Sequence, residues 1–191
     1  MINKDYWNNR YLNQETGWDL GEPSPPLKEV IDELENKSAA ILIPGCGNAH
    51  EVDYLLGQGF KNIIVIDIAP KLVETLELKY KENAEVNIIC GDFFEHEGLY
   101  DVILEQTFFC AIDPKLRPEY VSKMHLLLKP KGMLKGVLFN RTFEKEGPPF
   151  GGNIDEYQVL FEKDFKVNFK APVASIPGRE GFELLLEAVK I

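Results

Sequence analysis

Two glycines and a later acid have the types and the spacing of a ligand site. Gly45 and Gly47 follow the apolar run 40–43 and precede a stretch compatible with a helix. A strand that turns directly into a helix presents backbone N–H groups and the positive end of the helix dipole, and glycines leave that backbone open. Asp67 lies 20 residues after Gly47, where a second apolar run ends. This spacing is typical of an acid that accepts the two hydroxyls of a ribose. The pattern predicts a nucleoside-cofactor site; a purely structural strand–turn–helix corner is the alternative.

The third residue after this glycine pair distinguishes between two possible cofactors. A dinucleotide fingerprint needs a third glycine, which lets the helix approach the strand and the pyrophosphate. The corresponding residue here is His50, which argues against a pyrophosphate. S-adenosylmethionine has a ribose and no phosphate, so it is the cofactor that we expect.

Two further strand ends carry polar residues. Asp92 and Phe93 follow the apolar run 86–90 and could bracket an adenine ring, although Gly91-Asp92 also fits a simple turn. Gln106 follows the run 100–105. Because the carboxyl ends of parallel strands share one edge of a sheet, these residues are expected to meet Gly45 and Asp67 there.

The elements that must position these residues follow an α/β pattern. Ser24 and Pro25 are a favourable N-cap and first residue for a helix. Later strands and helices alternate, which predicts a Rossmann-like, doubly wound, mostly parallel seven-stranded sheet with helices on both faces. The sequence 129–132, Lys-Pro-Lys-Gly, is expected to be a turn that ends the helix 118–128. Strands are expected at 41–43, 63–66, 86–90, 100–105, 133–139, 165–170 and 182–191.

Length and composition narrow the class of protein. The 191 residues are expected to form a single domain, 1–191. A net charge of −10 disfavours nucleic acid and anionic membranes as partners. Three cysteines without metal-ligand spacing, no secretory leader and no long apolar span predict a cytoplasmic protein. The three histidines are scattered, so no metal site is expected, and we expect a monomer.

Both tryptophans lie in an N-terminal segment that is rich in aromatic residues, 1–22. Trp7 and Tyr11 can share one side of a short helix, and Trp18 follows it. These rings could simply pin the N-terminus to the body of the protein. Alternatively, the segment is a lid over the cofactor.

With these residues in view, the chain resembles the class I S-adenosylmethionine-dependent methyltransferases. More narrowly, it is similar to the thiopurine S-methyltransferase family, and especially to its halide/thiol methyltransferase branch. The similar motifs run in family order across nearly the whole chain. They are Gly17-Trp18-Asp19-Leu20-Gly21, Ile43-Pro44-Gly45-Cys46-Gly47, Val65-Ile66-Asp67-Ile68, Gly91-Asp92-Phe93-Phe94, Thr107-Phe108-Phe109-Cys110-Ala111-Ile112, Leu116-Arg117-Pro118, Leu126-Leu127-Leu128-Lys129-Pro130 and Gly147-Pro148-Pro149-Phe150.

The resemblance implies the class I methyltransferase fold and a role for each matching position. The N-terminal aromatics would cover the cofactor, the glycines would lie under its methionine part, and the acids would take the ribose and the adenine. Gln106 stands where relatives carry tyrosine or arginine, so its contact differs. The implied cofactor-binding residues are Trp7, Tyr11, Trp18, Gly45, Gly47, Asp67, Ile68, Asp92, Phe93 and Gln106.

The implied reaction is in-line methyl transfer to a small nucleophile such as a thiol, hydrosulfide or halide. It depends on placement more than on acid–base help, because a thiol with a pKa of about 8.5 is partly ionised near neutrality. No catalytic base is assigned; Glu105 is the nearest candidate, with a structural role as its alternative. A non-enzymatic cofactor-binding or interaction module on the same fold is the rival reading. The expected acceptor walls, for which core packing is the alternative, are Phe108, Phe109, Pro149 and Phe150.

Overall fold

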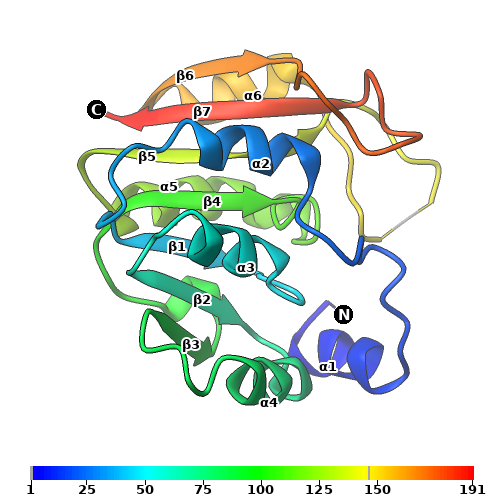
Figure 1. Ribbon diagram of the computed structural model, residues 1–191. Helices are drawn as coiled ribbons and strands as arrows, with labels where there is room; N and C mark the ends of the chain where they lie inside the picture. Colours follow the sequence, from blue (N-terminus) through cyan, green and yellow to red (C-terminus); the bar gives the residue numbers. More distant parts are fainter. Residues whose placement is uncertain (1, 146) are drawn as a thin grey trace.

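A seven-stranded sheet forms the centre of the computed structural model, which describes residues 2–145 and 147–191. The strand order is β3-β2-β1-β4-β5-β7-β6, and β7 runs antiparallel to both of its neighbours, β5 and β6 (Figure 1). The remaining neighbours are parallel, which confirms the predicted sheet. The strands are β1 Ile41–Pro44, β2 Ile63–Asp67, β3 Val86–Cys90, β4 Tyr100–Gln106, β5 Leu128–Phe139, β6 Phe165–Lys170 and β7 Glu183–Lys190. The expectation of a single domain stays a prediction.

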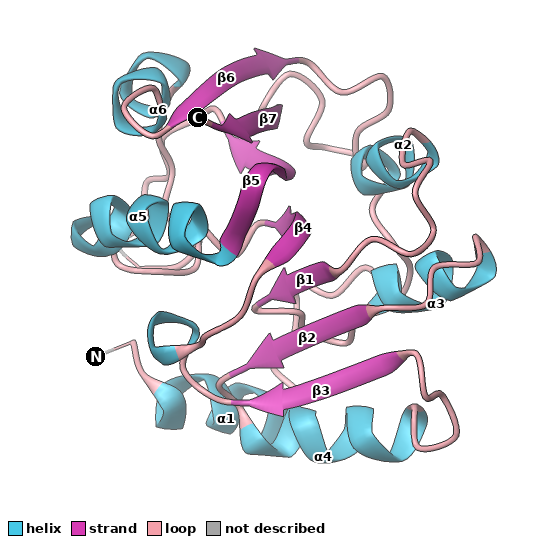
Figure 2. Ribbon diagram, turned by 90° about the vertical axis from the view of Figure 1, so that its left-hand side faces the viewer, coloured by secondary structure: helices cyan, strands magenta, loops and turns pink. Residues whose placement is uncertain are grey.

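Helices cover both faces of this sheet (Figure 2). As predicted, Ser24 caps α2: its side chain accepts the N–H of Leu27, and Pro25 is the first helical residue. None of the helices in the two described stretches is long and apolar enough to cross a membrane. The helices are α1 Lys4–Leu12, α2 Pro25–Asp32, α3 His50–Gly57, α4 Pro70–Lys79, α5 Arg117–Leu127 and α6 Ile154–Phe161, with 3-10 turns η1 Phe93–Glu95 and η2 Pro114–Leu116.

The alternation of side chains along the strands divides the core in two. Ile41 and Ile43 of β1 pack with the apolar faces of α2, α3 and α4, whereas Leu42 packs on the opposite face with α5 and α6. Successive strand residues point to opposite faces, so a strand buried on both sides must be apolar throughout. Both faces are therefore filled, and polar side chains gather at the ends of the strands.

The expectation that a turn at 129–132 separates the helix from the next strand is wrong. β5 begins at Leu128, directly after α5, and continues through Phe139. Leu128 pairs with Tyr100 and Met133 pairs with Val102, so the four residues between them face a single residue of β4. Lys131 has a φ of 64° there. The turn-forming residues thus mark a bulge inside the strand.

Candidate active site

A cavity of about 590 Å³ lies at the carboxyl ends of the parallel strands. Residues that follow β1, β2, β3, β4 and β5 line it, together with α1 and the segment after α1, which lies beyond the end of β2 (Figure 1). Neighbouring strands are about 4.8 Å apart, so a cavity that crosses this many strands is elongated. The predicted site residues that line it are Trp7, Tyr11, Trp18, Gly45, Gly47, Asp67, Ile68, Asp92, Phe93, Gln106, Phe108 and Pro149.

The glycine loop after β1 needs its glycines for two reasons. Gly45 and Gly47 have φ values of 56° and 52°, in the left-handed region that disfavours other residues. A Cβ on Gly45 would also overlap the ring of Phe108. At Gly47, a Cβ would lie 3.6 Å from the hydroxyl of Tyr11, inside the cavity. The loop therefore leaves backbone open to a ligand and admits the Phe108 ring.

Asp67 at the end of β2 is held by backbone N–H groups. It is 9% exposed; Oδ1 accepts from Ala69 N at 3.0 Å, and Oδ2 accepts from Gly47 N at 3.4 Å. Burial raises the pKa of Asp67 to about 6. The group is therefore mostly a carboxylate at neutral pH, and the residue lines the cavity.

The N-terminal aromatic residues cluster at the end of the cavity that contains Asp67. The ring centroids of Trp7 and Trp18 are 5.6 Å apart, and those of Tyr11 and Trp18 are 5.9 Å apart, both edge to face. The guanidinium of Arg10 lies 5.2 Å from the Trp18 ring centroid. α1 contains no buried residue. Trp7 and Tyr11, which are partly buried, pack against the core, and Lys71 N of α4 donates to Asn8 Oδ1 at 2.8 Å. The segment is thus held at the surface of the core by partly buried rings and by polar contacts.

One of those contacts was not anticipated from the sequence. Asp19 accepts hydrogen bonds from Asn48 Nδ2 and from Gly21 N, and His50 Nε2 lies 2.6 Å from Asp19 Oδ1. Burial alone would raise the pKa of Asp19, but the hydrogen bonds from Gly21, His50 and Asn48 lower it below its usual value. The residue that argued against a dinucleotide therefore ties the N-terminal segment to the start of α3.

The ends of β3 and β4 contribute two different kinds of polar group. Asp92 caps η1 by accepting the N–H of Phe94 at 2.9 Å, as expected for a turn. Phe93 is almost fully buried, with its ring centroid 5.3 Å from that of Phe108. Gln106 accepts from the hydroxyl of Ser24, and its Nε2 is buried without a hydrogen-bond partner among the described residues. The residue lines the cavity, and this nitrogen is buried beneath its surface.

The opposite end of the cavity is lined by rings and prolines. Phe108, Phe139, Pro148 and Pro149 lie there, with Arg179 from the loop between β6 and β7. Arg179 and Phe139 were not predicted, because no motif distinguishes either residue from an ordinary loop or strand residue.

Two of the expected acceptor walls do not line this cavity. Phe109 is 0% exposed and packs against Tyr120 and Tyr157, with the Arg117 guanidinium 4.6 Å from its ring centroid. Thr107 has a φ of 58°, and the chain turns there so that Phe108 faces the cavity while Phe109 enters the core. The expectation that Phe109 is a wall is therefore wrong.

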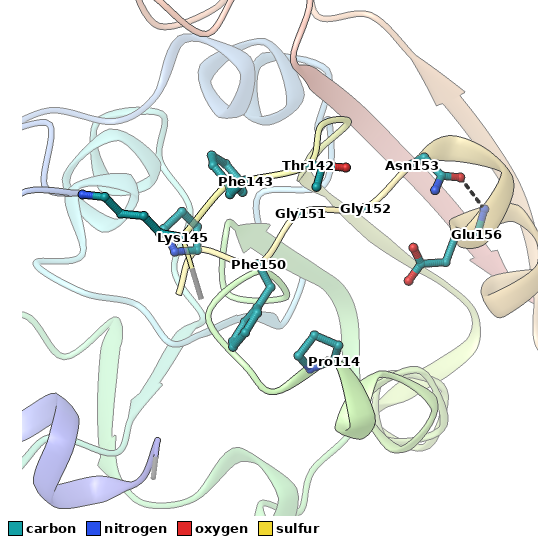
Figure 3. Close-up of a pocket in the computed structure, with 10 residues that line it drawn as sticks. Pro114, Thr142, Phe143, Lys145, Phe150, Gly151, Gly152, Asn153 and Glu156 are labelled. Carbon is teal, nitrogen blue, oxygen red and sulfur yellow. Dashed lines mark hydrogen bonds between the residues drawn. The ribbon is translucent and has the colours of Figure 1, made fainter. Parts of the chain in front are cut away.

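Phe150 lines a separate pocket instead. Figure 3 shows this second pocket, which has a volume of about 280 Å³ and is lined mainly by residues 142, 143, 145 and 149–153 of the loop after β5. Pro149 lines both spaces, so the loop is the partition between them. Phe150 N donates to Cys110 O at 2.7 Å, which fixes the partition to the loop after β4. The expectation that Phe150 lines the main cavity is wrong, because its ring lies on the far side of this partition.

Glu105 lies behind the cavity wall. It is 0% exposed, and Oε1 accepts from Phe109 N at 2.6 Å while Oε2 has no hydrogen-bond partner among the described residues. Burial raises the pKa of Glu105 to about 8. It does not line the cavity. This geometry favours the structural alternative over a catalytic base.

Comparisons with known proteins agree with this arrangement. Residues 2–176 match the family model described as thiopurine S-methyltransferase (TPMT). The chain is 30% identical over 186 residues to probable thiol methyltransferase 2 of Arabidopsis thaliana, which covers 94% of this chain and 82% of the relative. It is 29% identical to thiocyanate methyltransferase 1 of Brassica oleracea, with the same coverage. Thiopurine S-methyltransferase of Acinetobacter baylyi is 26% identical, and 85% of each chain is covered.

Solved structures show the same fold. The Burkholderia thailandensis 1,6-didemethyltoxoflavin-N1-methyltransferase, with bound S-adenosylhomocysteine, has a TM-score of 0.75 at 17% identity, covering 98% of this chain and 86% of that one. Magnesium protoporphyrin IX methyltransferase from Synechocystis, also with bound S-adenosylhomocysteine, has a TM-score of 0.75 at 14% identity, covering 98% and 97%. The expected class I methyltransferase fold is confirmed.

Proposed function

Because the chain belongs to the thiopurine S-methyltransferase family and is an S-adenosylmethionine-dependent methyltransferase, we propose that it methylates a small sulfur or halide nucleophile. The relatives are named for thiol, thiocyanate and thiopurine acceptors, and hydrosulfide and halides are the further acceptors that we propose. The observation that carries the proposal is the single cavity that joins the glycine loop and Asp67 to Phe108 and Pro149. Its volume of about 590 Å³ lies in the range of small-molecule sites. A macromolecular acceptor would need a wider, open surface.

The residues at the end of the cavity near β1 to β3 suit the cofactor. Gly45 and Gly47 provide open backbone, and the Asp67 carboxylate can accept two ribose hydroxyls. Gln106, at the end of the neighbouring strand β4, also lines the cavity, and we assign it to the cofactor as well. We assign the adenine to the neighbourhood of Asp92 and Phe93 and the cover to Trp7, Tyr11 and Trp18, with Ile68 beside the ribose. Aromatic faces suit a sulfonium cation, with an attraction of about 0.5–2 kcal/mol.

The protein contributes to the reaction by positioning the nucleophile and by excluding water from the cavity. When bound, S-adenosylmethionine supplies an electrophilic methyl group on a positively charged sulfur. Phe108 sits on Gly45, so a nucleophile held against this ring lies at the junction of the two ends of the cavity. Phe108, Pro149 and the N-terminal rings exclude water, which strengthens the attraction between an anion and a cation. A thiol that ionises with a pKa of about 8.5 needs no dedicated base.

A non-enzymatic module on the same fold is the less favoured function. The relatives that cover more than four-fifths of this chain are named as methyltransferases. The absence of a nucleic-acid partner, the monomeric state and the cytoplasmic location stay predictions.

Two measurements test the proposed function. S-adenosylhomocysteine should raise the melting temperature and NAD should not, because a ligand that binds the folded state stabilises it by mass action. Incubation with methyl-labelled S-adenosylmethionine and a panel of thiols, hydrosulfide, thiocyanate and iodide should then give labelled methylated products. Stabilisation by NAD alone, or methyl transfer to a macromolecule with none to any small nucleophile, would overturn the proposal.

A further inference from the structure

Arg179 is the cationic residue of the acceptor end of the cavity. Three described Lys or Arg residues line the cavity: Lys4, Arg10 and Arg179. Lys4 and Arg10 belong to α1, which packs against α4 on the cofactor side. The Arg179 guanidinium lies 5.3 Å from the ring centroid of Phe139, at the end of β5. An anion that enters the acceptor end therefore meets Arg179.

A buried acid fixes the position of this guanidinium. Glu183 is 2% exposed at the start of β7, where it pairs with Phe139 in the sheet. Its Oε1 lies 3.5 Å from Arg179 Nη1, and Oε2 has no hydrogen-bond partner among the described residues. A buried carboxylate is costly unless a cation is near it. Glu183 therefore holds Arg179 in place, while one-quarter of the Arg179 side chain stays exposed.

The guanidinium keeps free donors for a ligand. Arginine has five N–H donors in a planar fork that fits a carboxylate in bidentate fashion. The long contact with Glu183 is the one side-chain hydrogen bond that Arg179 makes to the described residues. The acids that line the cavity lie mainly elsewhere: Asp67 follows β2, Asp92 follows β3, and Asp19 bonds to the start of α3. Asp113 is the acid on the acceptor side, and its Oδ1 accepts from Lys115 N.

We propose that Arg179, positioned by Glu183, is a subsite for a carboxylate carried by the acceptor. The preferred acceptors are then small thiols with an acid group a few atoms from the sulfur, so that the sulfur reaches Phe108 while the carboxylate meets Arg179. Glu183 is a positioning residue, because it acts through Arg179 and does not line the cavity. This inference rests on the proposed methylation of small thiols.

A matched pair of acceptors tests the subsite. The wild-type protein should methylate 3-mercaptopropionate with a kcat/KM at least tenfold above that for its methyl ester, as expected for a charge-assisted hydrogen bond of 1.5–3 kcal/mol. Arg179→Met should abolish this ratio, because kcat/KM should fall at least tenfold more for the acid than for the ester, and Arg179→Lys should keep part of the ratio. Glu183→Gln should raise KM for the acid more than it lowers kcat, because the fork loses its orientation. If Arg179 and Glu183 served folding alone, their substitution would lower kcat/KM equally for both acceptors.

The control variant is Lys145→Met, which removes a cation that lines the second pocket and not the main cavity. It should keep the wild-type ratio. Calorimetry gives a readout that does not depend on turnover. With saturating S-adenosylhomocysteine present, 3-(methylthio)propionate should bind the wild type at least tenfold more tightly than Arg179→Met. Arg179→Met should lower the melting temperature, because it leaves the buried Glu183 carboxylate without its cation. Its affinity for S-adenosylhomocysteine should be unchanged, which shows that the variant is folded.

The outcomes separate the two claims. If the wild type methylates neither acceptor nor any other small nucleophile, the proposed function fails. If it methylates both acceptors with equal efficiency, or if Arg179→Met keeps the preference for the acid, the function stands and the carboxylate subsite is refuted.

Discussion

The two ends of the cavity are built from different materials. The end near β1, β2 and β3 consists of open backbone and of acids whose oxygens accept backbone N–H groups, as Asp67 does from Gly47 and Ala69. The end near β4, β5 and β7 consists of the rings of Phe108 and Phe139, the partition at Pro149, and Arg179. The first end has a fixed polar geometry suited to one cofactor. The second has shape and one charge, which can be retuned by single substitutions.

These ends meet at one contact. The ring of Phe108 occupies the space that a side chain on Gly45 would need. A substitution at Gly45 alters both the glycine loop and the position of the Phe108 ring, so it damages both ends, whereas a substitution that moves only one wall damages one end.

The largest effect is expected from Gly45→Ala, which breaks the distinction between the ends. Alanine at this position would have to adopt the backbone φ of 56°, and its methyl group would displace the Phe108 ring. The left-handed backbone costs about 1–2 kcal/mol, and a misplacement of about 1 Å can cost a hundredfold in rate. We expect kcat/KM for a thiol to fall about a hundredfold and affinity for S-adenosylhomocysteine to fall as well.

Gly17→Ala is the matched control. No atom lies within 4 Å of the position that its Cβ would occupy. Its kinetics should match the wild type. If Gly45→Ala is equally silent, the glycine loop is not the junction of the two ends.

Asp67→Asn should damage the cofactor end alone. Loss of a charged acceptor for ribose hydroxyls costs about 1.5–3 kcal/mol, or roughly ten- to a hundredfold in dissociation constant. In the wild type, affinity should weaken as the pH falls through about 6, the pKa to which burial raises Asp67. Calorimetry at pH 5 and pH 7.5 measures this, and the variant should show no such step. A wild-type affinity that is flat across this range would exclude the carboxylate contact.

The stability of the ligand-free protein should depend on the ionisation of Asp67 with a pH dependence opposite to that of cofactor affinity. Because its pKa is raised, the folded state holds a proton between about pH 4 and 6 that the unfolded state has lost. The free energy of unfolding therefore falls as the pH rises through that window. Asp67→Asn removes this titration but keeps one acceptor oxygen, so either Ala69 N or Gly47 N loses its acceptor. The ligand-free variant should therefore lack the fall in unfolding free energy between about pH 4 and 6. Thermal unfolding without ligand measures this.

Glu105→Ala should damage the acceptor end alone, by about tenfold in kcat/KM. The substitution leaves the N–H of Phe109 buried without its acceptor, which costs about 1–3 kcal/mol and loosens the loop that carries Phe108. Glu105→Gln keeps an acceptor oxygen and should restore most activity. It should also remove a fall in unfolding free energy between about pH 4 and 8, because burial raises the pKa of Glu105 to about 8. Equal losses in both variants would indicate a catalytic carboxyl group instead.

The smallest effect is expected from the N-terminal cover. Asp19→Ala removes the acceptor of Asn48 and the partner of His50, so affinity for S-adenosylhomocysteine should fall about three- to tenfold. Trp7 and Trp18 are the two tryptophans of the chain, so their emission reports the ordering of this segment. Glu15→Ala, which removes an exposed acid 3.7 Å from Arg10, is the control. An unchanged affinity after Asp19→Ala would leave the segment a packing element.

What the sequence could predict follows from the same contrast. The sheet and the glycine loop were predictable, because strands buried on two faces must be apolar and a left-handed turn needs glycine. The opposite orientations of Phe108 and Phe109 were not predictable from the sequence. The turn at Thr107 and the hydrogen bond from Phe109 N to Glu105 determine which of these two adjacent rings faces the cavity. Nor could the pairing of Arg179 with Glu183 be read, since it depends on how β7 lies beside β5.

The most direct test of the two-ended cavity measures two constants in two variants. The dissociation constant of S-adenosylhomocysteine and the KM of a small thiol at saturating S-adenosylmethionine are determined for Asp67→Asn and Glu105→Ala. We predict that Asp67→Asn raises the first at least tenfold and leaves the second within about threefold, and that Glu105→Ala does the reverse. If both constants rise together in both variants, the cavity behaves as one undivided site and the account is contradicted.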